Sequence, residues 1–346
     1  MIDLKTFTIE HIKSFQEKSK RDPELIERTI FALGLLEAII RSGLKFIFKG
    51  GTSLLLLLEE PRRFSTDIDI VVDPGTDVEK YLNITASIWP FINIVEQIRN
   101  VFTGIEKRHF KFSYTSPLHG NERTILLDIL FEENPYSTTI KRSIETELLI
   151  TDKPLLLACI PNTNCIIADK LTAFAPNTTG IKYNIGKELE IIKQLYDVAS
   201  LLDGINDFNE VKSNFEIISA TEIKYRNINV KPKDVLRDTI NTTICIASRG
   251  LYFPNEFDLL KDGIRGLRNF IFIENFTGEI AVQRACMVLY LAAAILTNQN
   301  NLPDIKNDDH YKSTNISSFE YNKLSSIKKT DMLAYKYLFE AVLMLS

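Results

Sequence analysis

Hydrophobic and polar positions repeat with a strand-like period in several short runs of the amino-terminal half of the chain. Alternation between the two faces of a strand favours β-structure, and β-branched residues strengthen that prediction. A helix is predicted to begin at Asp22-Pro23-Glu24, because an acidic residue before a proline is typical of a helix start. Another helix, interrupted at Pro90, is predicted over residues 77–98. The strand candidates are residues 46–49, 67–72, 108–114 and 124–131.

Apolar positions recur with the helical period from about Asn162 onwards. Residues 298–330 are rich in Asn, Ser, Lys and Asp, which predicts an exposed connection, and a last helix is predicted over 331–345. The fold class is therefore α+β: a small mixed β-sheet core with flanking helices, residues 1–155, followed by a helical-bundle domain, residues 156–346. The helix candidates are residues 162–175, 187–203, 207–226, 232–247, 255–275 and 279–296.

Composition narrows the class of protein. The 346 residues carry 41 Lys and Arg against 45 Asp and Glu, a formal net charge of -4, so a uniformly basic nucleic-acid binder is excluded. The longest apolar run, Ala285–Leu296, is shorter than the roughly 20 residues that cross a bilayer, and residues 1–20 lack the apolar core of a signal peptide. We expect a cytoplasmic protein without a membrane partner.

The cysteines and histidines show no metal-binding spacing, so we interpret the former as reduced thiols and the latter as ordinary surface or core residues. They are Cys159, Cys165, Cys245, Cys286, His11, His109, His119 and His310.

A glycine-rich turn follows the first strand candidate, in the sequence Lys49-Gly50-Gly51-Thr52-Ser53. A Gly-Gly turn that opens a helix lets a phosphate approach unpaired backbone N–H groups. In the next strand, Asp67 and Asp69 are two residues apart and point to one face. Neighbouring carboxylates repel each other unless a cation lies between them, and oxygen ligands suit Mg²⁺.

A third carboxylate, Asp128, lies inside the apolar run 125–131 and requires a cation or a hydrogen-bond donor. If its strand lies beside that of Asp67, three carboxylates converge, enough for the two metals of a nucleotidyl-transfer site. Asp128 is then the candidate base for the attacking hydroxyl. The alternative is a plain ion pair between Asp128 and Arg108 or Arg123.

Residues 49–54, together with Arg63-Phe64-Ser65-Thr66-Asp67-Ile68-Asp69, resemble the AbiEii/AbiGii toxin family of nucleotidyltransferases, in the DNA polymerase β-like superfamily. Ala168-Asp169-Lys170-Leu171 resembles the lysine motif of that family, and residues 193–197 resemble its basic-acid-x-x-acid motif. The family carries an acidic residue at the position of Gln194, and the segment 177–187 between the two motif helices is longer than is usual in the family. The clear resemblance covers residues 45–200.

The resemblance implies that residues 49–53 hold the triphosphate of an NTP and that Asp67 and Asp69 bind Mg²⁺. It also implies that Lys170 contacts phosphate and that Asp197 completes the site. From spacing alone, Lys193 and Asp197 are four residues apart and are better explained by an exposed helix pair than by a role in the site.

We therefore expect a Mg²⁺-dependent nucleotidyltransferase that transfers NMP to an acceptor hydroxyl. By resemblance the acceptor is RNA, perhaps a tRNA end, and the role is that of an abortive-infection toxin with a cognate antitoxin. The alternatives are a small-molecule nucleotidyltransferase and a catalytically silent nucleotide-binding module. A haloacid-dehalogenase-type phosphatase or a D-x-D glycosyltransferase fits less well, because the strand follows Asp67 rather than preceding it. Five basic residues form a candidate RNA track or a merely solvated helix face: Lys224, Arg226, Lys231, Lys233 and Arg237.

Overall fold

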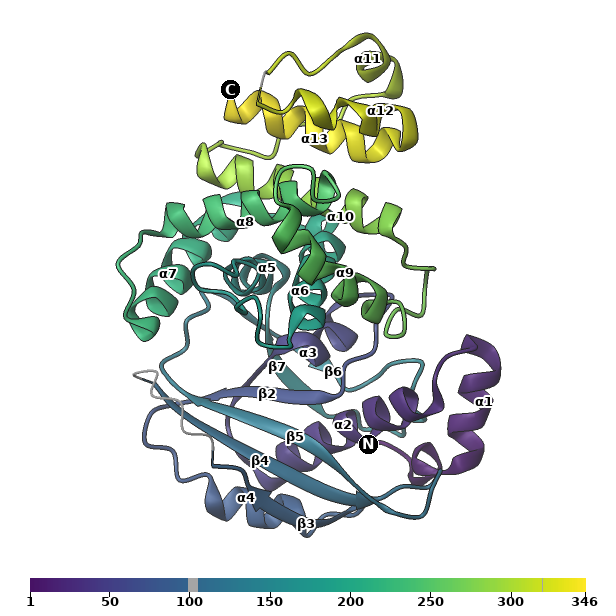
Figure 1. Ribbon diagram of the computed structural model, residues 1–346. Coiled ribbons are helices and arrows are strands. Elements are labelled where there is room, and N and C mark those ends of the chain that lie inside the picture. Colours follow the sequence, from purple (N-terminus) through teal and green to yellow (C-terminus); the bar gives the residue numbers. More distant parts are fainter. Residues whose placement is uncertain (99–104, 319) are drawn as a thin grey trace. The chain divides into compact units, whose positions relative to one another are not determined.

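The computed structural model describes residues 1–98, 105–318 and 320–346 (Figure 1). The chain forms two compact units, which are described separately below. The first comprises Met1–Asn162 with Asn269–Glu274, and the second comprises Thr163–Arg268 with Asn275–Ser346. The assignment of domains to residues 1–155 and 156–346 stays a prediction.

A five-stranded mixed sheet forms the centre of the first unit, in the order β1-β2-β5-β4-β3. Strands β2 and β5 are parallel, and every other neighbouring pair in this sheet is antiparallel. A separate antiparallel pair is formed by β6 and β7. The strands are β1 Ile47–Lys49, β2 Asp67–Val72, β3 Phe91–Glu96, β4 Glu106–Thr115, β5 Glu122–Phe131, β6 Thr139–Ser143 and β7 Leu157–Pro161.

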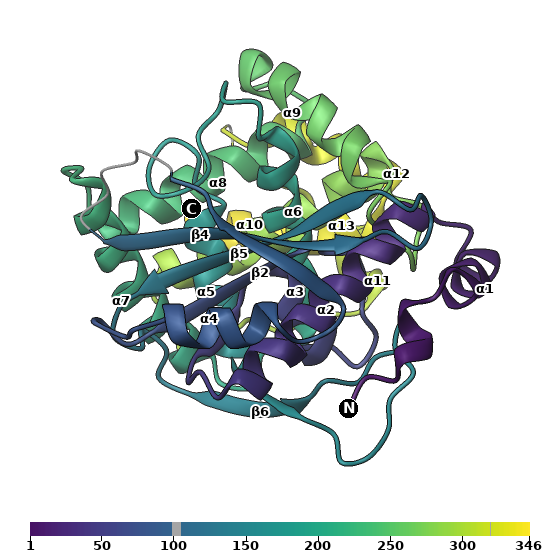
Figure 2. The same cartoon turned by 90° about the horizontal axis from the view of Figure 1, so that it is seen from below.

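Helix α2 (Pro23–Ser42) begins as the sequence predicts. The Asp22 carboxylate accepts a hydrogen bond from the backbone N–H of Glu24, and Pro23 occupies the first helical position. The helix packs against β2 and β5. The ring of Phe31 stacks on that of Tyr114 in β4, with the two ring centroids 3.8 Å apart. One face of the sheet is thus covered by α2, with α4 beside it (Figures 1 and 2). The other helices of this unit are a 3-10 helix Leu4–Phe7, α1 Ile9–Ser19, α3 Gly50–Leu57 and α4 Glu79–Ala86.

Alternation in β5 decides which side chains lie under α2. Ile125, Leu127 and Ile129 are at most 1% exposed, whereas the intervening positions are half-buried. The interleaved residue Asp128 therefore projects from the opposite face of the sheet, away from Phe31 and α2. The strands predicted over residues 108–114 and 124–131 are confirmed as β4 and β5; β4 is longer at both ends, and β5 begins two residues earlier.

The helix predicted over residues 77–98 is wrong for the second half of that segment. Only α4 is helical there, and the residues after Pro90 form β3, which pairs with β4. Proline lacks the N–H that would continue a helix, and the β-branched Ile92, Ile94 and Val95 suit an edge strand. The sequence patterns also did not predict strands β6 and β7. The helix predicted over 255–275 is too long, because α9 ends at Leu267 and Ile271 forms an isolated antiparallel β-bridge with Arg63.

The second unit contains only helices among its described residues. Helix α10 is its core, and it packs against α6, α8 and α13. Helix α10 extends beyond the apolar run Ala285–Leu296 and is long and apolar enough to cross a membrane. However, 72% of its most apolar 18-residue stretch is buried inside the protein. The helices are α5 Thr163–Ala173, α6 Glu188–Leu201, α7 Phe208–Arg226, α8 Pro232–Ala247, α9 Pro254–Leu267, α10 Gly278–Leu296, α11 Asp308–Ser313, α12 Ile327–Thr330 and α13 Met332–Leu345.

The polar segment 298–330 is more ordered than its composition predicts. It contains α11, α12 and the 3-10 helix Asn322–Ser326, while residue 319 lies outside the described residues. Tyr311 is fully buried, and its hydroxyl donates to the Glu340 carboxylate at 2.7 Å. A few buried anchors therefore hold a polar segment against α13.

The cysteines are free thiols, as predicted. Burial raises the pKa of Cys245 to about 12, so that thiol stays protonated at neutral pH. The fold class is confirmed: a small mixed sheet with flanking helices is followed by a helical unit.

Candidate nucleotide-binding and catalytic site

The turn after β1 is built around two glycines. Helix α3 begins at Gly50 itself, so residues 50–53 form its first turn and supply its unpaired N–H groups. Gly50 has φ +79°, which favours glycine, and a methyl group there would overlap the Asp69 carboxylate. A Cβ on Gly51 would lie 2.6 Å from Arg63 Nη2. The candidate phosphate cradle, residues 50–53, therefore requires glycine at position 50, whereas a side chain at position 51 would require Arg63 to shift.

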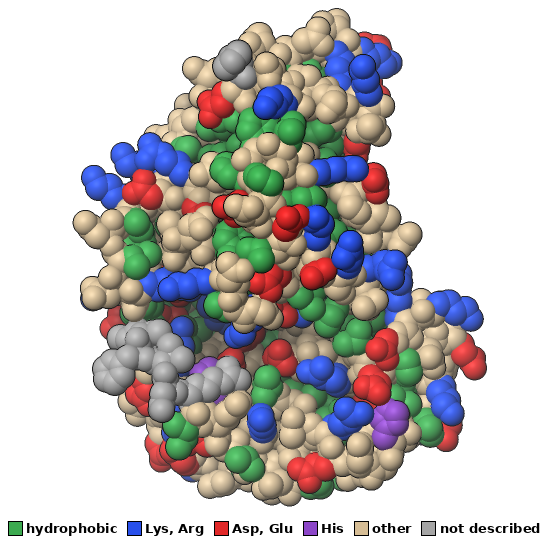
Figure 3. Space-filling model, viewed as in Figure 1, with side chains coloured by type: hydrophobic (Ala, Val, Ile, Leu, Met, Phe, Trp, Pro, Cys, Tyr) green, Lys and Arg blue, Asp and Glu red, His purple; other side chains and the backbone are tan. Residues whose placement is uncertain are grey.

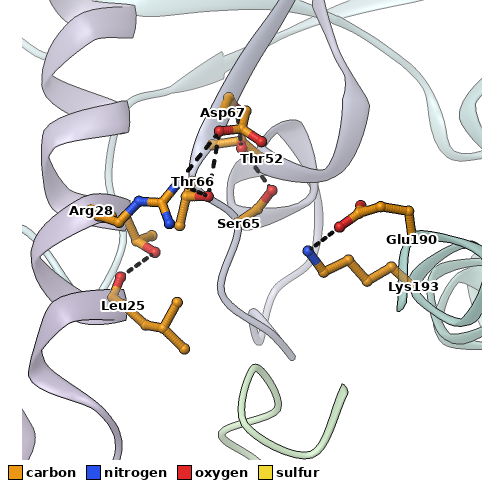
Figure 4. A network of polar contacts seen from close by, with 9 residues as sticks. Leu25, Arg28, Thr52, Ser65, Thr66, Asp67, Glu190 and Lys193 are labelled. Carbon is orange, nitrogen blue, oxygen red and sulfur yellow. Dashed lines mark hydrogen bonds and ion pairs between the residues drawn. The ribbon is translucent and has the colours of Figure 1, made fainter. Parts of the chain in front are cut away.

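The hydroxyls of the turn point into the protein. Thr52 and Ser53 are fully buried; Thr52 donates to the backbone carbonyl of Asp67, and Ser53 donates to that of Gly50 at 2.9 Å. The Thr52 hydroxyl also lies 2.9 Å from that of Ser65 (Figure 4). These side chains fix the turn to the start of β2, and the backbone amides are the groups suited to an anion.

A row of polar residues crosses four strands at one level. In the strand register, Lys49 of β1 lies opposite Asp69 of β2, and Asp69 lies opposite Asp128 of β5. Asp128 in turn lies opposite His109 of β4. Directly paired residues project to the same face, and neighbouring strands are about 4.8 Å apart. The register confirms that the Asp67 strand lies beside the Asp128 strand and directs Asp69 and Asp128 to the face opposite α2. The binding of metal by Asp67, Asp69 and Asp128 stays a prediction.

Asp67 starts β2 and is in contact with helix α2. The guanidinium Nη2 of Arg28 lies 3.8 Å from Asp67 Oδ1 and donates to the Thr66 hydroxyl at 3.1 Å (Figure 4). Both partners of the ion pair are nearly half exposed, so solvent screens the attraction. Sequence spacing gave no indication of Arg28, because its contact with Asp67 depends on how α2 packs.

Asp128 is held by a histidine, and the proposed pairing with Arg108 or Arg123 is wrong. His109 Nδ1 lies 2.7 Å from Asp128 Oδ1. Arg108 instead bonds to Glu79 and Glu96, and these hydrogen bonds lower the pKa of both glutamates. The sequence alone did not indicate this contact, because only strand pairing reveals that His109 faces Asp128.

Lys170 and Asp197 form a buried ion pair within the second unit. The ammonium of Lys170 on α5 lies 2.7 Å from Asp197 Oδ2 on α6, and the two side chains are 5% and 1% exposed. The alternative of an exposed Lys193–Asp197 pair is wrong because Asp197 is buried; Lys193 lies 2.8 Å from Glu190 (Figure 4). The contacts of Lys170 and Asp197 with a nucleotide stay a prediction.

The carboxylates fit a hard cation that shares its ligands with a substrate. Among the described residues, no group of three or more His, Cys, Asp or Glu side chains is close enough to form a metal site alone. Mg²⁺ does not require one, because it is commonly bound by one or two carboxylates, water and substrate phosphates. Asp69 and Asp128, paired in register beside the α3 amides, supply that partial set of oxygen ligands.

The family model "Nucleotidyl transferase AbiEii toxin, Type IV TA system" matches residues 35–277, more than half of the chain. The chain belongs to the AbiEii nucleotidyltransferase toxin family. The match includes the cradle, all three strand carboxylates, Lys170 and Asp197, whereas Arg28 precedes it. The resemblance inferred from the sequence motifs is therefore confirmed.

Other comparisons are more distant. No curated protein matches the chain. The JHP933 structure from Helicobacter pylori is 14% identical, with a TM-score of 0.45, covering 79% of this chain and 93% of that one. An antigenic nucleotidyltransferase-like protein from Paracoccidioides brasiliensis is 12% identical, with a TM-score of 0.37, covering 61% of this chain and 97% of that one.

Proposed function

We propose that this AbiEii-family protein binds an NTP and Mg²⁺ and transfers NMP to an acceptor hydroxyl. The observation that carries the proposal is the register of β2 with β5, which sets Asp69 beside Asp128. Gly50 leaves room for the Asp69 carboxylate at the first turn of α3, so the phosphate cradle and the carboxylates adjoin each other. An anion site next to oxygen ligands suits a triphosphate that arrives with its cation.

In the proposed reaction the acceptor oxygen attacks the α-phosphorus of the NTP. The bond from that phosphorus to the bridging oxygen breaks, pyrophosphate leaves, and the proton of the attacking hydroxyl passes to Asp128. The backbone N–H groups of residues 50–53 would orient the triphosphate, and Asp67, Asp69 and Asp128 would supply carboxylate oxygens to the metal ions when these are bound. Mg²⁺, when bound, neutralises charge on the phosphates, and two such ions would align the attacking and leaving oxygens.

We propose RNA, including a tRNA end, as the acceptor and a cognate antitoxin as a protein partner, in the cytoplasm, where NTPs and RNA occur. Charges of both signs are interspersed on the face seen in Figure 3, so RNA would need a local basic track. Lys224, Lys231 and Lys233 are exposed and support such a track. Arg226 and Arg237 contribute less positive charge to the track, because each has an acidic neighbour. Glu222 lies 3.7 Å from Arg226, and Asp234 lies 2.8 Å from Arg237.

Labelled transfer tests the reaction and identifies the acceptor. The protein is incubated with Mg²⁺, total cellular RNA and each NTP in turn, labelled at the α-phosphate. We expect label on RNA, and none with the double variant Asp67→Ala, Asp69→Ala. Equal labelling by that variant would refute the mechanism. Label on a small molecule would favour the antibiotic-type alternative, and pyrophosphate release without any labelled acceptor would exclude RNA.

The RNA track has its own test. Lys231→Glu with Lys233→Glu should weaken RNA labelling while leaving NTP binding unchanged, because both residues are exposed on α8 or at its start. The matched control is Lys13→Glu with Lys18→Glu on α1, which makes the same change in net charge. Equal losses in the two variants would indicate a net-charge effect and reject the track.

A further inference from the structure

A groove in the first unit, at the carboxyl-terminal end of α3, has an apolar floor and an acidic rim. Its volume is about 340 Å³, and leucines from the carboxyl-terminal end of α3, among them Leu55 and Leu56, form the floor together with Ile273. Ile273 is 45% exposed. Such a concave apolar surface is suited to receiving side chains from another molecule.

Four glutamates supply every charge that lines the groove: Glu59 and Glu60 after α3, and Glu145 and Glu147 after β6. All four are exposed, and none forms an ion pair with another described residue. Other surface glutamates, such as Glu79 and Glu96, are paired with an arginine. Four carboxylates around one apolar depression repel each other, and a cationic partner would relieve that repulsion.

We propose that this acidic groove is a docking site for a partner protein that inserts a short basic amphipathic segment. Apolar side chains of the segment would pack on the leucine floor, and its Lys or Arg residues would face the four glutamates. RNA is disfavoured here because the rim repels a polyanion. A symmetric contact between two copies is disfavoured because it would bring two acidic grooves together.

The position of the groove separates it from the nucleotide cradle. The cradle lies at the first turn of α3, whereas the floor includes the last turn, and a helix of eight residues is about 12 Å long. A segment in the groove would therefore not need to cover Gly50 and Gly51 at the first turn of α3. Docking does not depend on the proposed nucleotidyl transfer.

Fluorescence anisotropy with two synthetic probes tests the proposal. One is a fluorescein-labelled 14-residue amphipathic helix of Leu, Ala and Lys, and the other has Glu in place of each Lys. We expect saturable binding of the lysine probe and none of the glutamate probe. The variant Glu145→Lys with Glu147→Lys should bind the lysine probe about tenfold more weakly. Unchanged affinity would overturn the proposal.

Three controls separate the possible causes. Glu10→Lys with Glu17→Lys on α1 makes the same charge change, and an equal loss there would reduce the effect to net charge and overturn the proposal. Ile273→Ser should weaken binding, whereas Ile217→Ser, at a residue 51% exposed on α7, should not. If Ile273→Ser has no effect and spermine displaces the probe completely, the groove binds small cations and not an amphipathic segment.

A last measurement keeps this proposal distinct from the catalytic one. The variant Asp67→Ala, Asp69→Ala should bind the lysine probe as the unaltered protein does, and a saturating NTP should not displace it. Loss of binding in that variant would place the probe on the catalytic carboxylates and overturn the docking site. Failure of nucleotidyl transfer with intact probe binding would refute only the proposed function.

Discussion

Gly50 and Asp69 occupy adjoining space: the absent side chain of Gly50 leaves room for the Asp69 carboxylate. Lys49, the residue before that glycine, is paired with Asp69 across β1 and β2. The first turn of α3 and a strand carboxylate are therefore one structural unit. A glycine is required here by contact as well as by its positive φ.

Gly50→Ala should abolish transfer activity and lower stability, because the new methyl group displaces the Asp69 carboxylate. Gly75→Ala is the matched control, since Gly75 also has positive φ, +77°, but nothing lies near its Cβ position. The control should lose only the backbone contribution, about 1 kcal/mol. Urea unfolding and NTP turnover measure the two effects, and equal activity in both variants would contradict the contact with Asp69.

His109 is expected to position Asp128, given their 2.7 Å contact. His109→Leu should lower the rate of NMP transfer about tenfold, as is typical for a residue that orients a ligand carboxylate. His109→Asn places an amide N–H near the position of Nδ1 and should restore most of the rate, with the KM for NTP little changed in either variant. Steady-state kinetics distinguish these outcomes, and equal rates for Leu and Asn would exclude positioning.

The Lys170–Asp197 pair should stabilise the second unit through burial. Lys170→Met removes the ammonium that lies 2.7 Å from the 1%-exposed Asp197 carboxylate, so the free energy of unfolding should fall by about 3–5 kcal/mol. Lys170→Met combined with Asp197→Leu should lose much less, since no charge remains buried. Urea unfolding of the double-mutant cycle tests this. The exposed Arg265–Asp262 pair serves as the comparison, and removing it should change stability little.

Asp238 should make the stability of the second unit depend on pH. Burial raises the pKa of this carboxyl above its ordinary 3.8, although Asn177 and Thr178 donate hydrogen bonds to it at 2.7 to 2.9 Å. The folded state then binds the proton more tightly than the unfolded state. This contribution is fully present below pH 3.8 and is lost as the pH rises through the folded pKa.

Urea unfolding at pH 4, 5, 6 and 7 measures that dependence. The variant Asp238→Asn cannot titrate, so its free energy of unfolding should fall less between pH 4 and 7 than that of the unaltered protein. The same slope in both proteins would assign the pH dependence to other groups.

Local chemistry in the sequence determined several features of this protein. Asp22-Pro23 fixed the start of α2, and the β-branched run from Asp67 gave β2 with its observed bounds. The two-residue period placed Asp67 and Asp69 on one face, and the family motifs identified the nucleotidyltransferase family. Each of these depends on neighbours within a few residues, whose side-chain directions follow from the backbone period.

Only the tertiary structure decided what faces those residues. Strands β2 and β5 are far apart in the sequence, and their parallel pairing sets Asp69 beside Asp128. The contacts of Asp128 with His109 and of Asp67 with Arg28, like the burial of Asp197, depend on strand register and helix packing. These arise from long-range burial of apolar surface, which a local pattern of residues does not encode.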